Sequence, residues 1–230
     1  MQEWRLEYYR PQVQYDYEQQ WKSIDDLYCN FPQPIKIERY MFKSTQDTLR
    51  LMPRLADRSV VIKPVDPIYI SAGQRGMLYI STPLWLAGFV DGQKDPLFDI
   101  PVILPKDTWF GPNHRTGEIC YATAVDGRTE LQQLKSRAFR AVTPIEFHNT
   151  SSQQLRFDRM NVPVSALPLF YSESTSRLWT SQIKVIHEAL DKPARIRIEN
   201  RTPPHAGEVI YVHPPRSPGG HLFNMFDSFF

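Results

Sequence analysis

A pattern of alternating apolar and polar residues occurs twice along the chain. In the clearer copy, residues 145–148 alternate, and residues 155–158 repeat the alternation after a polar turn at residues 149–152. A two-residue period is typical of strands that bury one face. The other copy runs over residues 68–80, and in both copies the two apolar pairs lie ten residues apart. The repetition predicts two similar β-units.

Further short apolar or alternating segments predict strands along most of the remaining chain. They comprise residues 35–41, 48–51, 59–62, 77–90, 97–104, 118–125, 137–147, 162–164, 169–171, 178–187 and 194–198. Helical spacing is confined to residues 21–28 and 129–135. The 20 prolines, twice the 10 glycines, agree with this, because proline removes a backbone donor and breaks helix interiors.

Strands at intervals of roughly ten residues indicate a β-sandwich. We therefore predict an all-β fold of two consecutive, similar β-sandwich (Ig-like) units. The predicted parts are an aromatic N-terminal arm (1–34), a first unit (35–135), a second unit (136–200) and an extended C-terminal tail (201–230). The arm either packs over the main domain or serves as a binding surface. The tail is rich in proline and glycine, so we expect it to be extended or poorly ordered.

The charges of the chain are nearly balanced, since 27 basic and 25 acidic side chains give a formal net charge of +2. Proteins that bind nucleic acids or anionic membrane surfaces carry basic stripes, and the densest basic segment here, residues 135–140, is short. No apolar segment reaches the ~18 residues of a membrane span, and the N-terminus lacks an apolar segment of signal-peptide length. We therefore expect a cytoplasmic protein without nucleic-acid or membrane partners.

Four short segments resemble the motifs of a known family. They are the K-P-V-x-P segment within residues 60–67, the aromatic-Gly-Pro at 110–112, the G-x-I-C at 117–120 and the V-P-V-S at 162–165. The chain is similar, over about residues 58–190, to an uncharacterised and mainly archaeal family that is known only as a domain of unknown function. The resemblance implies an all-β fold and no established activity, and it identifies no catalytic residue.

The six histidines and two cysteines form no metal-binding pattern. Neither the Cys/His spacings of zinc sites nor the G-x-S-x-G motif of a nucleophilic serine occurs. Cys29 and Cys120 are expected to be free thiols in a reducing compartment. Cys120 fits a small core residue, and the alternative is a nucleophile served by His114 or His148. We predict no metal and no cofactor, and we favour a non-enzymatic function.

Four aspartates also crowd one segment without the spacing of a calcium-binding loop. They are Asp91, Asp95, Asp99 and Asp107.

A turn in the middle of the chain collects side chains that suit a ligand site. The candidate ligand-binding residues are Asp107, Trp109, Phe110, His114 and Arg115. Aromatic rings can stack on a ligand while histidine and arginine hold an anion. The alternative is a turn whose tryptophan and phenylalanine close one end of the core.

The C-terminus ends in a cluster of phenylalanines behind a proline- and glycine-rich spacer. The candidate partner-binding residues are Phe223, Phe226, Phe229 and Phe230. A flexible tether with aromatic anchors is a common way for a peptide to dock in a groove. The segment resembles a sliding-clamp-binding peptide, but Phe223 stands where that motif has glutamine. The alternative is that the tail packs back on its own domain or on a second copy.

Three functions follow from these features. The leading one is a non-enzymatic interaction or scaffold protein, with homodimer formation through exposed strand edges or the aromatic arm. The second is a small-ligand-binding protein or enzyme that uses residues 109–115. The third is partner binding of the sliding-clamp type by the aromatic tail.

Overall fold

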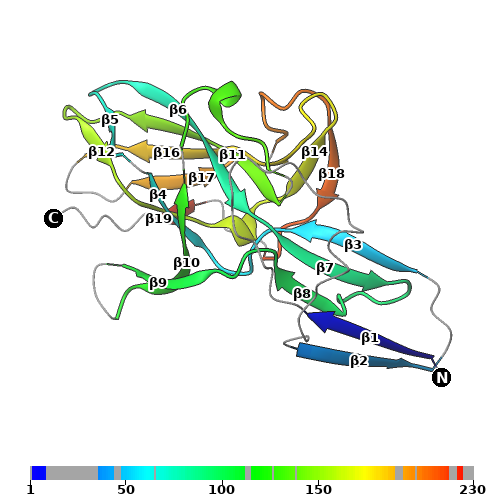
Figure 1. Ribbon diagram of the computed structural model, residues 1–230. Coiled ribbons are helices and arrows are strands. Elements are labelled where there is room, and N and C mark those ends of the chain that lie inside the picture. Colours follow the sequence, from blue (N-terminus) through cyan, green and yellow to red (C-terminus); the bar gives the residue numbers. More distant parts are fainter. Residues whose placement is uncertain are drawn as a thin grey trace. The chain divides into compact units, whose positions relative to one another are not determined.

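The computed structural model is all-β, as predicted (Figure 1). It describes residues 2–8, 36–43, 48–64, 66–111, 115–125, 127–137, 139–189, 194–199, 201–217 and 222–224. The chain divides into a small unit, residues 1–49 with 90–92, and a large unit, residues 50–89 with 93–230. The described residues contain no α-helix, so this part of the chain has no helix that could cross a membrane.

The small unit contains β1 (Gln2–Tyr8) and β2 (Lys36–Phe42), which pair antiparallel. The strands that follow along the chain are β3 (Leu49–Arg54), β4 (Val60–Pro64), β5 (Ile68–Ile70), β6 (Arg75–Pro83), β7 (Trp85–Val90), β8 (Phe98–Pro101), β9 (Lys106–Phe110), β10 (Glu118–Val125), β11 (Arg140–Asn149), β12 (Leu155–Phe157), β13 (Met160–Val162), β14 (Leu169–Ser172), β15 (Arg177–Thr180), β16 (Ile183–His187), β17 (Arg195–Ile198), β18 (Val209–His213) and β19 (Leu222–Asn224). Two short 3-10 turns, η1 (Leu131–Gln133) and η2 (Val164–Ala166), interrupt them. The helical spacing predicted at 129–135 is thus a single tight turn, and residues 21–28 lie outside the described residues.

The largest sheet has the order β18-β14-β15-β11-β16-β17-β19, and β6 pairs with β11 as well. Its central strand β11 is antiparallel to β6 and parallel to β15 and β16. A second sheet has the order β13-β4-β10-β9, and smaller sheets are β3-β7-β8 and β12-β5. The strands β6, β11, β16 and β17 run side by side in Figure 1.

The two copies of the strand pattern interlock. The copy at residues 68–80 contains β5 and β6, and the copy at residues 145–158 contains part of β11 and β12. β5 pairs with β12, so that Ile70 faces Leu155, and β6 pairs with β11, so that Leu78 faces Ile145. All four side chains belong to one buried cluster. Strands from the predicted units 35–135 and 136–200 therefore share one core, while the division into two consecutive Ig-like sandwiches stays a prediction.

A buried asparagine holds this interlocked arrangement at the turn after β11. The Asn149 Nδ2 donates to the carbonyl oxygens of Ile70 at 3.0 Å and of Gln153 at 2.7 Å. Its Oδ1 accepts the Ser151 N–H at 3.1 Å and the Ser151 hydroxyl at 2.7 Å. Because a buried amide needs such partners, Asn149 ties the turn of one copy to β5 of the other.

The predicted C-terminal tail supplies two strands of the largest sheet. β18 pairs antiparallel with β14, and β19 pairs antiparallel with β17. The two strands lie at opposite ends of the strand order. For its described residues, the tail packs back on its own unit, which is the alternative that the sequence left open.

Candidate functional site

The predicted loop site lies on the β9–β10 hairpin, where strand alternation separates its aromatic residues. Phe110 is buried, whereas Trp109 is partly exposed on the opposite face of β9. The Trp109 indole covers Gly117, because a Cβ at Gly117 would lie 2.5 Å from the ring. Asp107 and Arg115 are exposed. Trp109 and Phe110 therefore do not form one common surface, and His114 lies outside the described residues.

Phe110 instead belongs to a small apolar cluster with Val61 and Cys120. The Arg159 guanidinium lies over the Phe110 ring, 4.7 Å from its centre. Burial, with a smaller contribution from Glu118, raises the pKa of the Cys120 thiol to about 12. A thiol with this pKa is protonated at neutral pH and is a poor nucleophile. The geometry supports the interpretation of Phe110 and Cys120 as core residues.

Metal-ligating residues do not gather in the described part of the chain. No group of three histidine, cysteine, aspartate or glutamate side chains lies close enough there to hold an ion. Of the predicted tail residues, Phe223 lies in β19 opposite Ile196. Phe226, Phe229 and Phe230 lie outside the described residues, so the clamp-type hypothesis stays a prediction.

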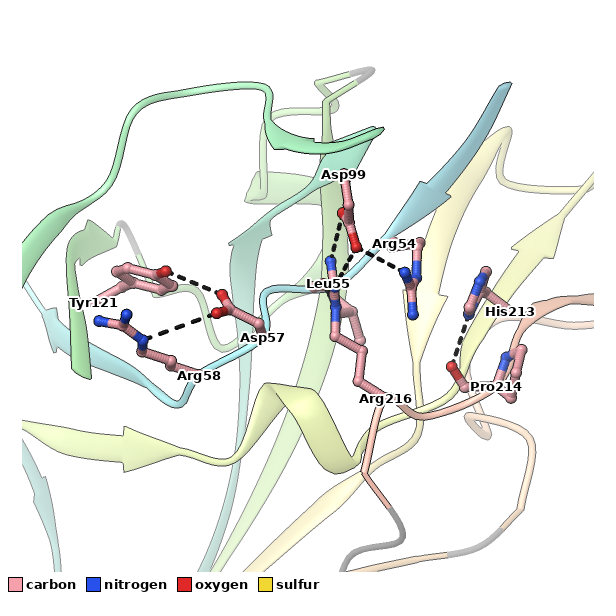
Figure 2. A network of polar contacts seen from close by, with 9 residues as sticks. All are labelled: Arg54, Leu55, Asp57, Arg58, Asp99, Tyr121, His213, Pro214 and Arg216. Atoms are coloured by element: carbon pink, nitrogen blue, oxygen red, sulfur yellow. Dashed lines mark hydrogen bonds and ion pairs between the residues drawn. The ribbon is translucent and has the colours of Figure 1, made fainter. Parts of the chain in front are cut away.

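A polar network that the sequence analysis did not identify joins three distant segments (Figure 2). The Asp99 carboxylate on β8 accepts a hydrogen bond from Arg54 Nη1 on β3 at 2.7 Å. It also accepts two from Arg216, one of them from Nη2 at 2.8 Å. The side chains of Asp99 and Arg216 are only 18% and 14% exposed. Such a bidentate, partly buried pair is stronger and more directional than an exposed ion pair.

Arg216 makes further contacts that fasten the chain just after β18. Its Nε donates to the Leu55 carbonyl at 2.6 Å, and its guanidinium lies 5.2 Å from the centre of the Trp85 ring. The backbone N–H groups of Arg216 and Ser217 both donate to the Ser165 carbonyl. We call Arg54, Asp99 and Arg216 the arginine clamp, because together they fix where the chain leaves the sheet.

The clamp places two positive groups beside one carboxylate. Burial lowers the pKa of Arg54, Arg216 lowers it further, and Asp99 opposes both effects. Burial also lowers the pKa of His213 at the end of β18, where its Nδ1 donates to the Pro214 carbonyl at 2.8 Å. A histidine whose pKa lies below about 6.5 is neutral at pH 7.

Figure 2 also shows a separate group, whose charged side chains are more exposed than those of the clamp. The Tyr121 hydroxyl donates to Asp57 at 3.0 Å, and the Arg58 guanidinium lies over the Tyr121 ring. Arg58 also pairs with Asp57 and with the predicted site residue Asp107, at 3.8 and 3.6 Å. Exposed pairs of this length contribute little to stability, so the group is a weak candidate for a built site.

The edge strand β18 exposes large side chains to solvent. Ile210 and Tyr211 are 57% and 55% exposed, and Tyr171 on the neighbouring strand β14 is exposed as well. Ile210 faces Tyr171 across the strand pair, while Tyr211 faces Phe170 with ring centres 5.6 Å apart. Successive strand residues point to opposite faces. Large apolar side chains are therefore exposed on both faces of the sheet along one edge.

The sequence contained a signal for this strand. Residues 209–212 are Val-Ile-Tyr-Val, a run of β-branched and aromatic residues that is typical of strands. The proline and glycine content of residues 201–230 favoured an extended tail instead. No local signal marks the clamp, because Asp99 and Arg216 are 117 positions apart.

Comparison with known families gives one match. A family model described as "Protein of unknown function (DUF432)" matches residues 1–227. No curated protein and no solved structure matches the chain. The match confirms the expected membership in an uncharacterised domain-of-unknown-function family, and it extends over more of the chain than the four motifs do.

Proposed function

The chain belongs to the DUF432 family of proteins of unknown function, and we propose that it is a non-enzymatic interaction protein that binds a partner strand along the edge of β18. The observation that carries this proposal is the composition of that edge. β18 contains neither proline nor a lysine, arginine, aspartate or glutamate. Natural proteins usually protect exposed edges with such residues, because a bare edge pairs with other chains.

The other long edge strands differ from β18 in carrying charged residues or proline. Within the described residues, edge strands longer than three residues all carry a charge or a proline except β18. β9, at the edge of the second sheet, carries Lys106 and Asp107, and β3 carries Arg50 and Pro53. Among these longer edge strands of the described residues, β18 is therefore the one that lacks such protection.

The side chains around β18 suit strand addition. In this mode of recognition, main-chain hydrogen bonds supply affinity and alternate side chains supply specificity. Ile210, which lies beside Tyr171 of β14, would contact an added strand on one face, and Tyr211 would contact it on the other. The arginine clamp holds the chain beyond β18 in place, so little ordering is needed when the partner binds.

The chemistry of the described residues supports a non-enzymatic role. Burial keeps the Cys120 thiol protonated, and the side chains of the predicted loop site are divided between two faces of β9. Ligand binding at residues 109–115 and clamp-type binding by the tail stay alternative predictions. The cytoplasmic location and the Ig-like units also stay predictions.

A photo-crosslinking experiment in cells tests the proposal. Tyr211 is replaced by the photoreactive residue p-benzoylphenylalanine in the full chain, and Tyr69 is replaced in a control. Tyr69 is 56% exposed on β5 and therefore matches Tyr211 in residue type, strand location and exposure. We expect protein adducts from position 211 and not from position 69. Equal adduct formation at both positions, or none at 211, would overturn the proposal.

A further inference from the structure

We infer that the strand that pairs with β18 is β18 of a second copy, so that the protein forms a two-fold symmetric dimer through a continuous sheet. This inference rests on the proposed function and names its partner. A two-fold dimer brings the same surface of both copies together. The strand must therefore be compatible with itself in an antiparallel arrangement.

The sequence of β18 meets this requirement. With His213 neutral, no residue from Val209 to His213 is charged at pH 7. Pairing centred on Ile210 sets Ile210 opposite itself, Val209 opposite Tyr211 and Val212 opposite Glu208. Pairing centred on Tyr211 sets Tyr211 opposite itself, Ile210 opposite Val212 and Val209 opposite His213. The nearest acidic residue, Glu208, does not face its own copy in either arrangement. Like charges therefore do not meet across the axis, where they would destabilise the pair.

The direction of the strands also favours self-pairing. β15, β14 and β18 already alternate in direction, since β14 is antiparallel to both of its neighbours. A second β18 added antiparallel continues that alternation. The formal net charge of +2 means that two copies repel each other only weakly.

The structure also limits the length of the dimer contact. A shift in register between Leu169 and Phe170 leaves Val209 to Tyr211 as the regular part of the strand. Pro214 and Pro215 follow β18 and lack the N–H needed to extend the ladder. These features prevent the pairing from extending beyond the C-terminal end of β18.

Analytical ultracentrifugation of the purified full chain over a range of concentrations tests the dimer. Ile210→Lys places two lysines near the axis, and Ile119→Lys is the matched control, because Ile119 is 55% exposed on β10. We expect a dimer for the wild type and for Ile119→Lys. We expect the dimer dissociation constant of Ile210→Lys to rise at least about 100-fold, because like charges that face each other across an interface cost several kcal/mol. Far-UV circular dichroism of both variants checks that they fold.

The outcomes separate the inference from the proposed function. If the wild type is monomeric at every concentration, or if both variants lose the dimer equally, the inference that β18 pairs with a second copy is wrong. If position 211 then still forms adducts with another protein in cells, binding along β18 stands with a different partner. If β18 pairs with itself, the adduct at position 211 consists of two chains of 26.9 kDa each.

Discussion

Arg216 and Asp99 form a bidentate pair across 117 positions of the sequence. The pair joins the segment after β18 to β8, and a hydrogen bond from Arg216 to the Leu55 carbonyl adds a third contact. Arg54 shares the same carboxylate. One side chain in the predicted tail thus connects three segments of the large unit, and it holds the chain just after the exposed edge strand.

The contacts of the arginine clamp lead us to expect that Arg216→Lys clearly lowers the stability of the fold. Lysine keeps the charge, but it cannot donate at once to both Asp99 oxygens and to the Leu55 carbonyl. We expect the free energy of unfolding to fall by about 2 kcal/mol, measured by urea denaturation. The control is Arg201→Lys, since Arg201 is 77% exposed and pairs with Glu199. We expect less than about 0.5 kcal/mol there. Equal losses would contradict a special role of the clamp.

The strands were predictable where alternation is strong. Leu155 and Phe157 are buried on either side of exposed Arg156, as the two-residue period predicts. The pairing partner was not predictable, because a period reports that one face is buried but not which strand lies alongside. Ile70 faces Leu155 in the interlocked arrangement, and nothing in either segment specifies the other.

The candidate sites were less predictable than the strands. The spacing of Trp109 and Phe110 showed an aromatic pair, but adjacent strand residues point to opposite faces and only Phe110 is buried. Asp99 was one of four neighbouring aspartates, and its partners Arg54 and Arg216 lie far away in the sequence. Long-range ion pairs arise from the fold and leave no local pattern.

The hydrogen bonds of buried Asn149 lead us to expect that the isosteric substitution Asn149→Asp destabilises the fold. In Asn149→Asp a carboxylate would face the carbonyl oxygens of Ile70 and Gln153, to which the amide now donates. We expect a loss of about 3 kcal/mol in the free energy of unfolding at neutral pH, because a buried, charged oxygen would face carbonyl oxygens that have lost their donor. The control is Gln154→Glu in the same turn, where the side chain is exposed. A loss at position 149 no larger than that of the control would refute this role of Asn149.

We expect the Cys120 thiol not to react in the folded protein. It is fully buried, and its pKa is raised to about 12. In a Cys29→Ser background Cys120 is the sole remaining cysteine, and we expect no labelling by a disulfide reagent in native buffer and complete labelling in urea. Rapid labelling of the native protein would show that Cys120 is an accessible nucleophile.

The lowered pKa of His213 leads us to expect that the folded protein loses stability in mild acid. Burial, the largest cause, lowers its pKa below the ordinary value of about 6.5, and the arginines of the clamp add to this effect. The hydrogen bond to the Pro214 carbonyl and the charge of Asp99 act in the opposite direction but do not cancel it. The unfolded chain therefore binds a proton at a pH where the folded chain does not. The stabilisation from neutral His213 is complete above about pH 6.5 and is lost as the pH falls towards the lowered pKa.

The variant His213→Gln isolates this contribution. The buried His187 also has a pKa lowered by burial, but it is present in both proteins and cancels in the difference. We expect the free energy of unfolding of the wild type, relative to the variant, to be constant above about pH 6.5 and to decrease as the pH falls below that value. Urea denaturation at several pH values measures it. Parallel pH profiles would mean that His213 has the same pKa in the folded and unfolded chains, and that the clamp and the burial of β18 do not affect its protonation.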